Sequence, residues 1–289
     1  MNTLACCCVD GSDSKGEIPD RLGIKAFNWS EEPVGISEHS GALKAEAGHT
    51  HLQARPLVKL ESGATYIGQW RGETRHGYGV HTREDGQVYE GQFHEDQAQG
   101  HGKCIAPNGN EYEGEWLQDR AHGSGKYVHM DGSSYIGQWY MDEKSGQGVE
   151  SWADGAHYEG QFQRGMKHGH GIYSTLAGIN YEGKFVQDKM HGEGTYKFVD
   201  GRVYSGQWVA SQIGGKGKMV WPNGSNYEGE YINNAKHGEG MFTWPDGRVY
   251  RGQWKAGKQD GAGVLIDTEG RQVEGKWLNG ERLSDKGPP

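Results

Sequence analysis

The sequence predicts an all-β fold: an elongated, single-layer antiparallel sheet of stacked β-hairpins, each about 23 residues long. A pentad of the form Tyr-x-Gly-x-aromatic, as in Tyr112 to Trp116, returns every 23 residues. A turn dipeptide, Asp-Gly or Asn-Gly, places its glycine three residues before most pentads, as at Gly109. A Gly-x-Gly triplet follows in the same register, as at Gly77 and Gly79. Self-similarity at a fixed period of this length indicates a stacked repeat architecture.

Each repeat has the pattern of one hairpin. Side chains alternate between the faces of a strand, so Tyr66 and Trp70 fall on the same face. The polar stretch 71–76 contains Gly72 and predicts a turn. Asp85-Gly86 ends the repeat with a dipeptide that tolerates positive φ. Successive hairpins are therefore expected to pair into one long sheet.

The regular glycines predict close contact between backbone and aromatic rings. A ring from Tyr66 or Trp70 is expected to lie over Gly77 and Gly79, because glycine leaves bare backbone that a ring can cover. Burying one large aromatic side chain stabilises by roughly 1.5–3 kcal/mol, whereas ordering each residue costs roughly 1.5 kcal/mol. One hairpin cannot stand alone on these terms, so stability must come from stacked neighbours.

The chain divides into three parts. Residues 1–59 are expected to be an irregular and poorly ordered N-terminal segment, with a lead-in strand at residues 57–60. Residues 60–280 form the array, with about nine full repeats and a degenerate last one in which Val273 replaces the tyrosine. Residues 281–289 are expected to be a tail. The last strand is an open sheet edge, which predicts pairing with a second copy of the chain unless something covers it.

Composition limits the classes of function. The chain has 289 residues, 50 glycines, 33% hydrophobic residues and a net charge of −9, so no basic nucleic-acid-binding footprint is expected. No apolar run is long enough for a transmembrane helix, and residues 1–8 lack the pattern of a secretory signal. Four cysteines, three of them adjacent, do not form a disulfide framework, which predicts a cytoplasmic protein.

Three consecutive cysteines near the N-terminus, Cys6, Cys7 and Cys8, are candidates for reversible S-palmitoylation. Two or three acyl chains would anchor the protein stably to a membrane. The alternative is three unmodified thiols in an unstructured tail. Metal binding is a third and weaker interpretation, because three consecutive thiols cannot surround one zinc ion tetrahedrally.

The aromatic side chains of the pentads form the candidate partner-binding stripe. Such a stripe packs against the sheet's own glycines, and an open aromatic trough also accepts a helix or an extended peptide. Its members are Tyr66, Trp70, Tyr89, Phe93, Tyr112, Trp116, Tyr135, Trp139, Tyr158, Phe162, Tyr181, Phe185, Tyr204, Trp208, Tyr227, Tyr231, Tyr250 and Trp254.

No catalytic, cofactor-binding or metal site is expected. Five histidines share one register: His76, His122, His168, His191 and His237. Equivalent residues of neighbouring hairpins lie roughly 9–10 Å apart, too far to share an ion, so we interpret these as turn histidines. The glutamates that follow several tyrosines, such as Glu90 and Glu113, form a solvated column on the opposite face.

Tyr-x-Gly-x-Trp, followed by His-Gly-x-Gly and Asp-Gly, resembles the MORN-repeat (membrane occupation and recognition nexus) family over about residues 60–280. The resemblance implies a cytoplasmic scaffold or adaptor that links protein partners at a membrane or cytoskeletal structure. With Cys6 to Cys8, it favours a palmitoylated, membrane-tethered scaffold. The alternatives are a ciliary or axonemal assembly subunit without a lipid anchor, as in radial spokes, and a regulatory partner of a phosphoinositide kinase.

Overall fold

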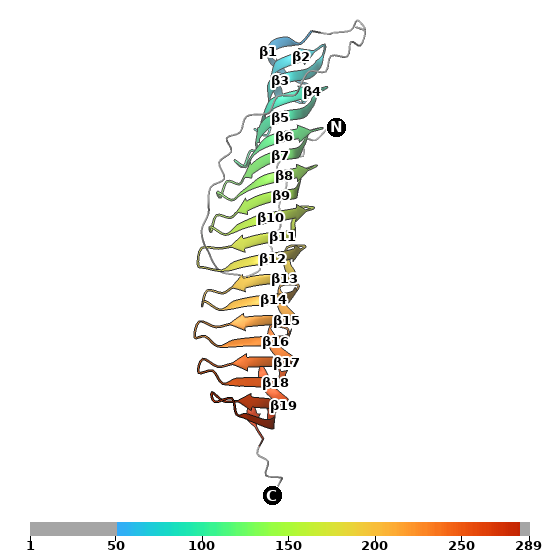
Figure 1. Cartoon of the computed structure of the whole chain (residues 1–289). Helices are drawn as coiled ribbons and strands as arrows, with labels where there is room; N and C mark the ends of the chain where they lie inside the picture. The colour runs from blue at the N-terminus through green and yellow to red at the C-terminus, as the bar shows by residue number, and fades with distance from the viewer. Residues whose placement is uncertain (1–50, 284–289) are drawn as a thin grey trace, which may run out of the picture.

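The computed structural model describes residues 51–283, and every regular element in that range is a β-strand. The strands form one antiparallel sheet in which each strand pairs with its neighbours in sequence. Figure 1 shows a long rod, with β1 at one end and the last strands at the other. The part of the chain described by the structure has no helix that could span a membrane. The predicted all-β, single-layer architecture is confirmed.

The strand bounds are β1 Gln53–Lys59, β2 Thr65–Arg71, β3 Thr74–Thr82, β4 Val88–His94, β5 Gln97–Ile105, β6 Glu111–Leu117, β7 Arg120–Val128, β8 Ser134–Tyr140, β9 Glu143–Ser151, β10 His157–Gln163, β11 Met166–Ser174, β12 Asn180–Val186, β13 Lys189–Lys197, β14 Val203–Val209, β15 Gln212–Val220, β16 Asn226–Ile232, β17 Ala235–Thr243, β18 Val249–Lys255, β19 Lys258–Ile266, β20 Gln272–Leu278 and β21 Glu281–Arg282.

Each hairpin joins a seven-residue strand to a nine-residue strand, as in β4 and β5. The loop between them has two residues: Glu95 and Asp96 have φ of 48° and 66°, the positive values of a type I′ turn. The predicted turn at residues 71–76 is therefore too long. The strand resumes at Thr74, which leaves only residues 72 and 73 in the loop.

The two extra residues of each longer strand form a bulge. Gly68 pairs with Gly79, and the next pair is Trp70 with Arg75, so residues 76–78 face Gln69 alone. Gly77 lies inside this bulge with a φ of +76°, which favours glycine. The two glycines of the Gly-x-Gly triplet therefore have different roles. The first permits a left-handed backbone, and the second permits close packing.

The core is a single line of aromatic rings along the sheet. The ring of Tyr66 meets Trp70 of its own repeat and Phe93 of the next repeat edge to face, each with a centroid distance of 5.2 Å. A Cβ on Gly79 would overlap the Tyr66 hydroxyl, so the predicted covering of that glycine by the ring is confirmed. Gly77 is covered by Gln69 instead, because the bulge turns it away from the ring.

Every repeat tyrosine satisfies its buried hydroxyl in the same way. Tyr66 donates from Oη to the backbone carbonyl of Gln69 at 3.0 Å, and Tyr89 to Tyr250 repeat the bond three residues along. The Gln69 side chain in turn accepts from the backbone N–H of Tyr78 in the bulge at 2.8 Å. These bonds use polar groups that would otherwise be unpaired next to the rings.

The ends of the array differ from the predicted domain boundaries. β1 begins at Gln53, before residue 60, and pairs with β2, where the Arg55 guanidinium lies 4.9 Å from the centre of the Trp70 ring. Residues 57–59 of the predicted lead-in strand are thus the end of a longer strand. At the other end, Glu281 and Arg282 pair with β20 as a short final strand. Cys6, Cys7 and Cys8 lie outside the described residues.

Candidate interaction surface

The predicted aromatic stripe is buried within the sheet's own packing. All of its members, from Tyr66 to Trp254, are at most 6% exposed. Each tyrosine is enclosed by the rings and glycines of its own and the next repeat, which explains the burial without a partner. The stripe therefore stabilises the array, and its contact with a partner stays a prediction.

A second set of side chains beside the stripe reaches the surface. We define the flanking row as the two positions that lie 15 and 17 residues after each repeat tyrosine. The first position pairs with tyrosines on both sides, as Tyr173 does with Tyr158 and Tyr181. In later repeats the row contains large, partly buried aromatic side chains, which pack on the core and remain accessible at one edge: Trp152, Tyr173, Phe198, Trp221, Phe242 and Trp244.

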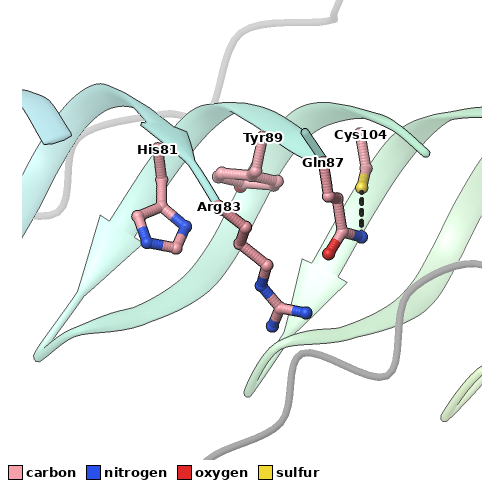
Figure 2. A pocket seen from close by; sticks show the side chains of 5 residues that line it. All are labelled: His81, Arg83, Gln87, Tyr89 and Cys104. Atoms are coloured by element: carbon pink, nitrogen blue, oxygen red, sulfur yellow. Dashed lines mark hydrogen bonds between the residues drawn. The ribbon is translucent and has the colours of Figure 1, made fainter. Parts of the chain in front are cut away.

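The same row is closed in the first repeats. His81, Cys104 and Ala106 are at most 7% exposed. Figure 2 shows the Gln87 amide beside Cys104, where Nε2 donates to Sγ at 3.1 Å. Burial lowers the pKa of His81 to about 4, and the nearby arginines act in the same direction. The imidazole is therefore neutral at neutral pH, and this end of the row offers little apolar surface.

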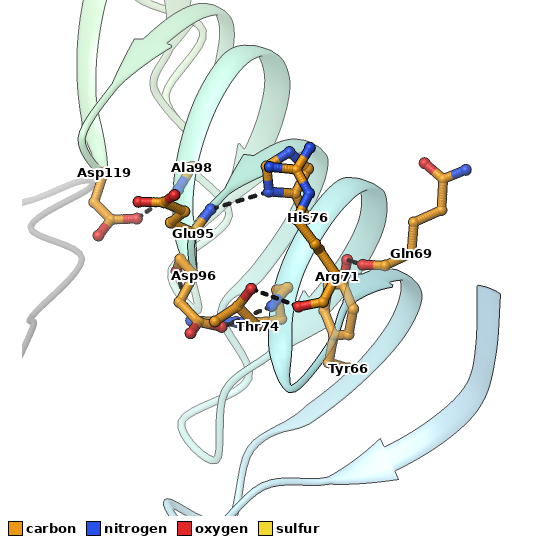
Figure 3. Close-up of polar contacts among 10 residues, drawn as sticks. Tyr66, Gln69, Arg71, Thr74, His76, Glu95, Asp96, Ala98 and Asp119 are labelled. Carbon is orange, nitrogen blue, oxygen red and sulfur yellow. Dashed lines mark hydrogen bonds and ion pairs between the residues drawn. The ribbon is translucent and has the colours of Figure 1, made fainter. Parts of the chain in front are cut away.

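The hairpin loops form a second ladder between repeats. The backbone N–H of Ala98 donates to Asp119 Oδ1 at 2.7 Å, and the Asp119 N–H donates back to the Ala98 carbonyl at 3.0 Å. Figure 3 shows this aspartate with Asp96, which captures the N–H of Arg75 in the same way at 2.8 Å. The position needs a side-chain oxygen that accepts this hydrogen bond, because Ser211 and Asn234 make the same bond to Met190 and Ile213 in later repeats. Sequence reasoning assigned these aspartates no role, although their spacing repeats.

The register-matched histidines lie in strands rather than in turns. His76 sits in the bulge of β3, where its Nδ1 accepts from the Glu95 N–H at 3.4 Å (Figure 3), and its ring centre lies 4.7 Å from that of His94. Burial lowers the pKa of His76. Within residues 51–283, no group of three His, Cys, Asp or Glu side chains is placed to hold a metal ion.

The opposite face of the sheet is polar and solvated, as the glutamate column predicted. Glu90 and Glu113 are exposed, and Glu90 accepts a hydrogen bond from the Tyr78 hydroxyl at 2.7 Å. Single apolar residues such as Ile67 and Ile136, each 47% exposed, are scattered over this face. Tyr78 and Tyr140, 52% and 63% exposed, are single exposed aromatic side chains outside the flanking row, whereas the flanking row groups several partly exposed rings side by side.

Within residues 51–283, one open sheet of similar hairpins with a ring ladder and no covering layer defines a repeat-protein scaffold. The MORN-repeat family model matches residues 66–88, 89–111, 112–134, 135–157, 158–175, 181–201, 204–226, 227–247 and 250–270. The chain belongs to the MORN-repeat family, and the predicted nine full repeats are confirmed.

Two of the solved structures that are similar to the chain resemble it only remotely, and no curated protein matches the chain in sequence. One similar structure is the TCP10 domain of Danio rerio CPAP in complex with a STIL peptide. It is 13% identical, with a TM-score of 0.31, over 77% of this chain and 99% of that one. Another is the SAS-4 TCP domain of Drosophila melanogaster with a proline-rich motif of Ana2. It is 11% identical, with a TM-score of 0.24, over 69% and 90% of the chains. These scores carry no functional argument.

Proposed function

We propose that the chain is a non-catalytic scaffold that binds protein partners along the flanking row and links them to a membrane or cytoskeletal structure. The observation that supports this function is the run of accessible aromatic side chains from Trp152 to Trp244 on a rigid sheet. Tryptophan, tyrosine and phenylalanine supply large contact areas and are typical anchors of protein interfaces.

In-cell cross-linking tests this function. A variant with Trp221→Ser and Trp244→Ser should lose the cross-linked partners that the wild-type chain captures. A control with Ile67→Ser and Ile136→Ser changes exposed apolar residues on the opposite face and should keep them. If the tryptophan variant retains every cross-link, the flanking row is not the binding surface.

For the membrane link, we propose palmitoylation of Cys6, Cys7 and Cys8, which supplies the several acyl chains needed for stable anchoring. Replacing all three with serine should move the protein from the membrane fraction to the soluble fraction. An axonemal or cytoskeletal subunit, the second candidate, would instead stay with the detergent-resistant fraction whatever stands at these positions. Binding to a phosphoinositide kinase would show as a specific cross-link among the captured partners.

A further inference from the structure

One lysine in the array lacks the anion that its counterparts have. Lys144, Lys167 and Lys236 occupy the same position, nine residues after Tyr135, Tyr158 and Tyr227. Each ammonium lies over aromatic rings. Lys236 has four around it, with Nζ at 4.3 Å from the centre of Trp254, 4.7 Å from Phe242, 5.4 Å from Tyr227 and 5.8 Å from Trp221.

The first two lysines are neutralised within the chain. Lys144 forms an ion pair with Glu150. Lys167 lies 3.9 Å from Glu150 and 3.7 Å from Asp188. Buried ammonium groups are costly unless they are paired, and these carboxylates provide the pairing.

The three positions that supply those carboxylates have none around Lys236. Phe242 stands where Glu150 serves Lys144, and Met219 stands where Glu150 serves Lys167. Gly257 stands where Asp188 serves Lys167. Among residues 51–283, Lys236 has no ion pair, and burial alone lowers the pKa of its amine to about 8. At neutral pH this ammonium is still mostly protonated and lacks a counter-charge.

The surroundings of this cation are accessible and aromatic. Trp221, Phe242 and Trp244 of the flanking row are partly exposed. The nearby Arg248 is paired with Asp246 at 2.8 Å. A carboxylate supplied by a partner would therefore stabilise the unpaired Lys236 ammonium. The aromatic rings beside it favour contact with apolar side chains of the same partner.

We propose that Lys236 and the aromatic side chains of Trp221, Phe242 and Trp244 form a docking site for a partner peptide with an acidic side chain flanked by apolar residues. The carboxylate takes the place that Glu150 and Asp188 fill for the other lysines, and the apolar residues cover the exposed ring edges. The proposal rests on the proposed scaffold function and names the partner chemistry at one point of the flanking row.

The test uses the full chain and two fluorescein-labelled peptides, Gly-Ser-Leu-Glu-Phe-Ser-Gly and the same peptide with Gln in place of Glu. Fluorescence polarisation should show that the Glu peptide binds at least about tenfold more tightly, because hydrogen bonds to a charged group are among the strong ones. Lys236→Met should remove that preference. Met190 occupies the equivalent position in β13, so this variant is expected to fold. Lys258→Met, at an exposed lysine of β19, controls for bulk charge.

Gly257→Asp provides the decisive variant. Gly257 has a φ of +86° with open space around it, and aspartates at the same loop position adopt positive φ elsewhere in the array. The new carboxylate should pair with Lys236 as Asp188 does with Lys167, and weaken the Glu peptide about tenfold. Gly165→Asp makes the same change beside Lys144, which already has Glu150, and should leave binding unchanged.

Several results would overturn the inference. Equal affinity for the two peptides, no binding of either, or full preference in Lys236→Met would each exclude the site. Tighter peptide binding by a Glu31→Gln, Glu32→Gln variant would show that these two glutamates of the N-terminal segment compete for the site, and would assign it to the chain itself instead of a partner. If the peptides show no preference for Glu, but the Trp221→Ser, Trp244→Ser variant still loses the cross-linked partners of the wild-type chain, only this inference is wrong. Cross-links that survive in the tryptophan variant would remove the proposed function itself.

Discussion

The first three repeats and the later repeats share one ring ladder but differ in the row beside it. Tyr89 and Tyr227 are both buried, and each meets an aromatic ring of the next repeat at 5.1 Å. The flanking-row residues next to Tyr89 are Cys104 and Ala106, which are buried. Those next to Tyr227 are Phe242 and Trp244, which are partly exposed. The ladder positions set the fold, and the flanking positions vary without disturbing it. Binding properties can therefore differ from repeat to repeat on one unchanged frame.

Alkaline pH should unfold both regions together, the largest effect we expect. Burial raises the pKa of Tyr66, Tyr204 and Tyr250 to about 12, above the ordinary value of 10. Because the fold favours the neutral phenols, their contribution to stability is complete below pH 10 and is lost between pH 10 and pH 12. Denaturant titrations followed by tyrosinate absorbance would measure it. If one region unfolded at a lower pH than the other, the ring ladder would not stabilise the two regions equally.

Adding a methyl group under a ladder tyrosine should cost about the same in either region. In Gly102→Ala and Gly240→Ala the new Cβ would overlap the hydroxyl and ring of Tyr89 and Tyr227, respectively. We expect each to lower the unfolding free energy by about 3 kcal/mol or more. Gly132→Ala, at a loop glycine with a φ of +90° and open space, should cost only about 1–2 kcal/mol. Clearly unequal losses for the first two variants would show that the ladder is not uniform.

Within the later repeats, the same substitution at Lys144 and at Lys236 should have different effects on stability. Lys144→Met leaves Glu150 with only the longer contact to Lys167, so we expect a loss of about 1–2 kcal/mol at neutral pH. Lys236→Met removes a cation that has no carboxylate, so its effect should be within about 1 kcal/mol, neutral or stabilising.

The stability difference between Lys236→Met and the wild type should change with pH in a defined direction. The folded-state pKa of Lys236, about 8, lies below its ordinary 10.5, so the penalty for burying the ammonium is complete below pH 8 and disappears as the pH rises toward 10.5. Any advantage of the variant should therefore shrink over that range. The groups of β16 that face the amine, Tyr227 and Tyr231, stay neutral there because burial raises both pKa values. Chemical denaturation at several pH values checks this, and a growing advantage would contradict it.

The smallest predicted effect is a gain from Lys184→Gln. In seven repeats a Gln or Glu at this position accepts a backbone N–H of the bulge, as Gln161 does from His170 at 3.1 Å. A lysine side chain has no acceptor atom. Restoring glutamine should raise the unfolding free energy by about 0.5–1 kcal/mol. Thermal denaturation of Lys184→Gln measures this gain. Lys189→Gln, at an exposed lysine of the next strand, is the control.

The architecture could be predicted from the sequence because one pattern is repeated without insertions. In the first repeat, for example, the spacing places a strand at Tyr66, the glycine that its ring covers at Gly79 and a turn at Asp85-Gly86. The bulge was missed because two glycines in alternation look alike, although only Gly77 has a positive φ. The site was missed for another reason. Lys236 becomes unusual only when Met219, Phe242 and Gly257 are compared with their counterparts in other repeats, which requires the three-dimensional register.

The neighbour-only pairing of the strands has a consequence for how the protein is made. Tyr66 completes its ring contacts once Phe93 has been added, and each later tyrosine waits for the next repeat in the same way. A ribosome releasing the chain from its N-terminus would thus allow repeat after repeat to join a growing structure. Each newly made strand leaves an unpaired backbone edge until the next strand pairs with it, and β21 covers β20 only at Trp277 and Leu278. Translation pausing late in the message would therefore prolong the aggregation-prone period.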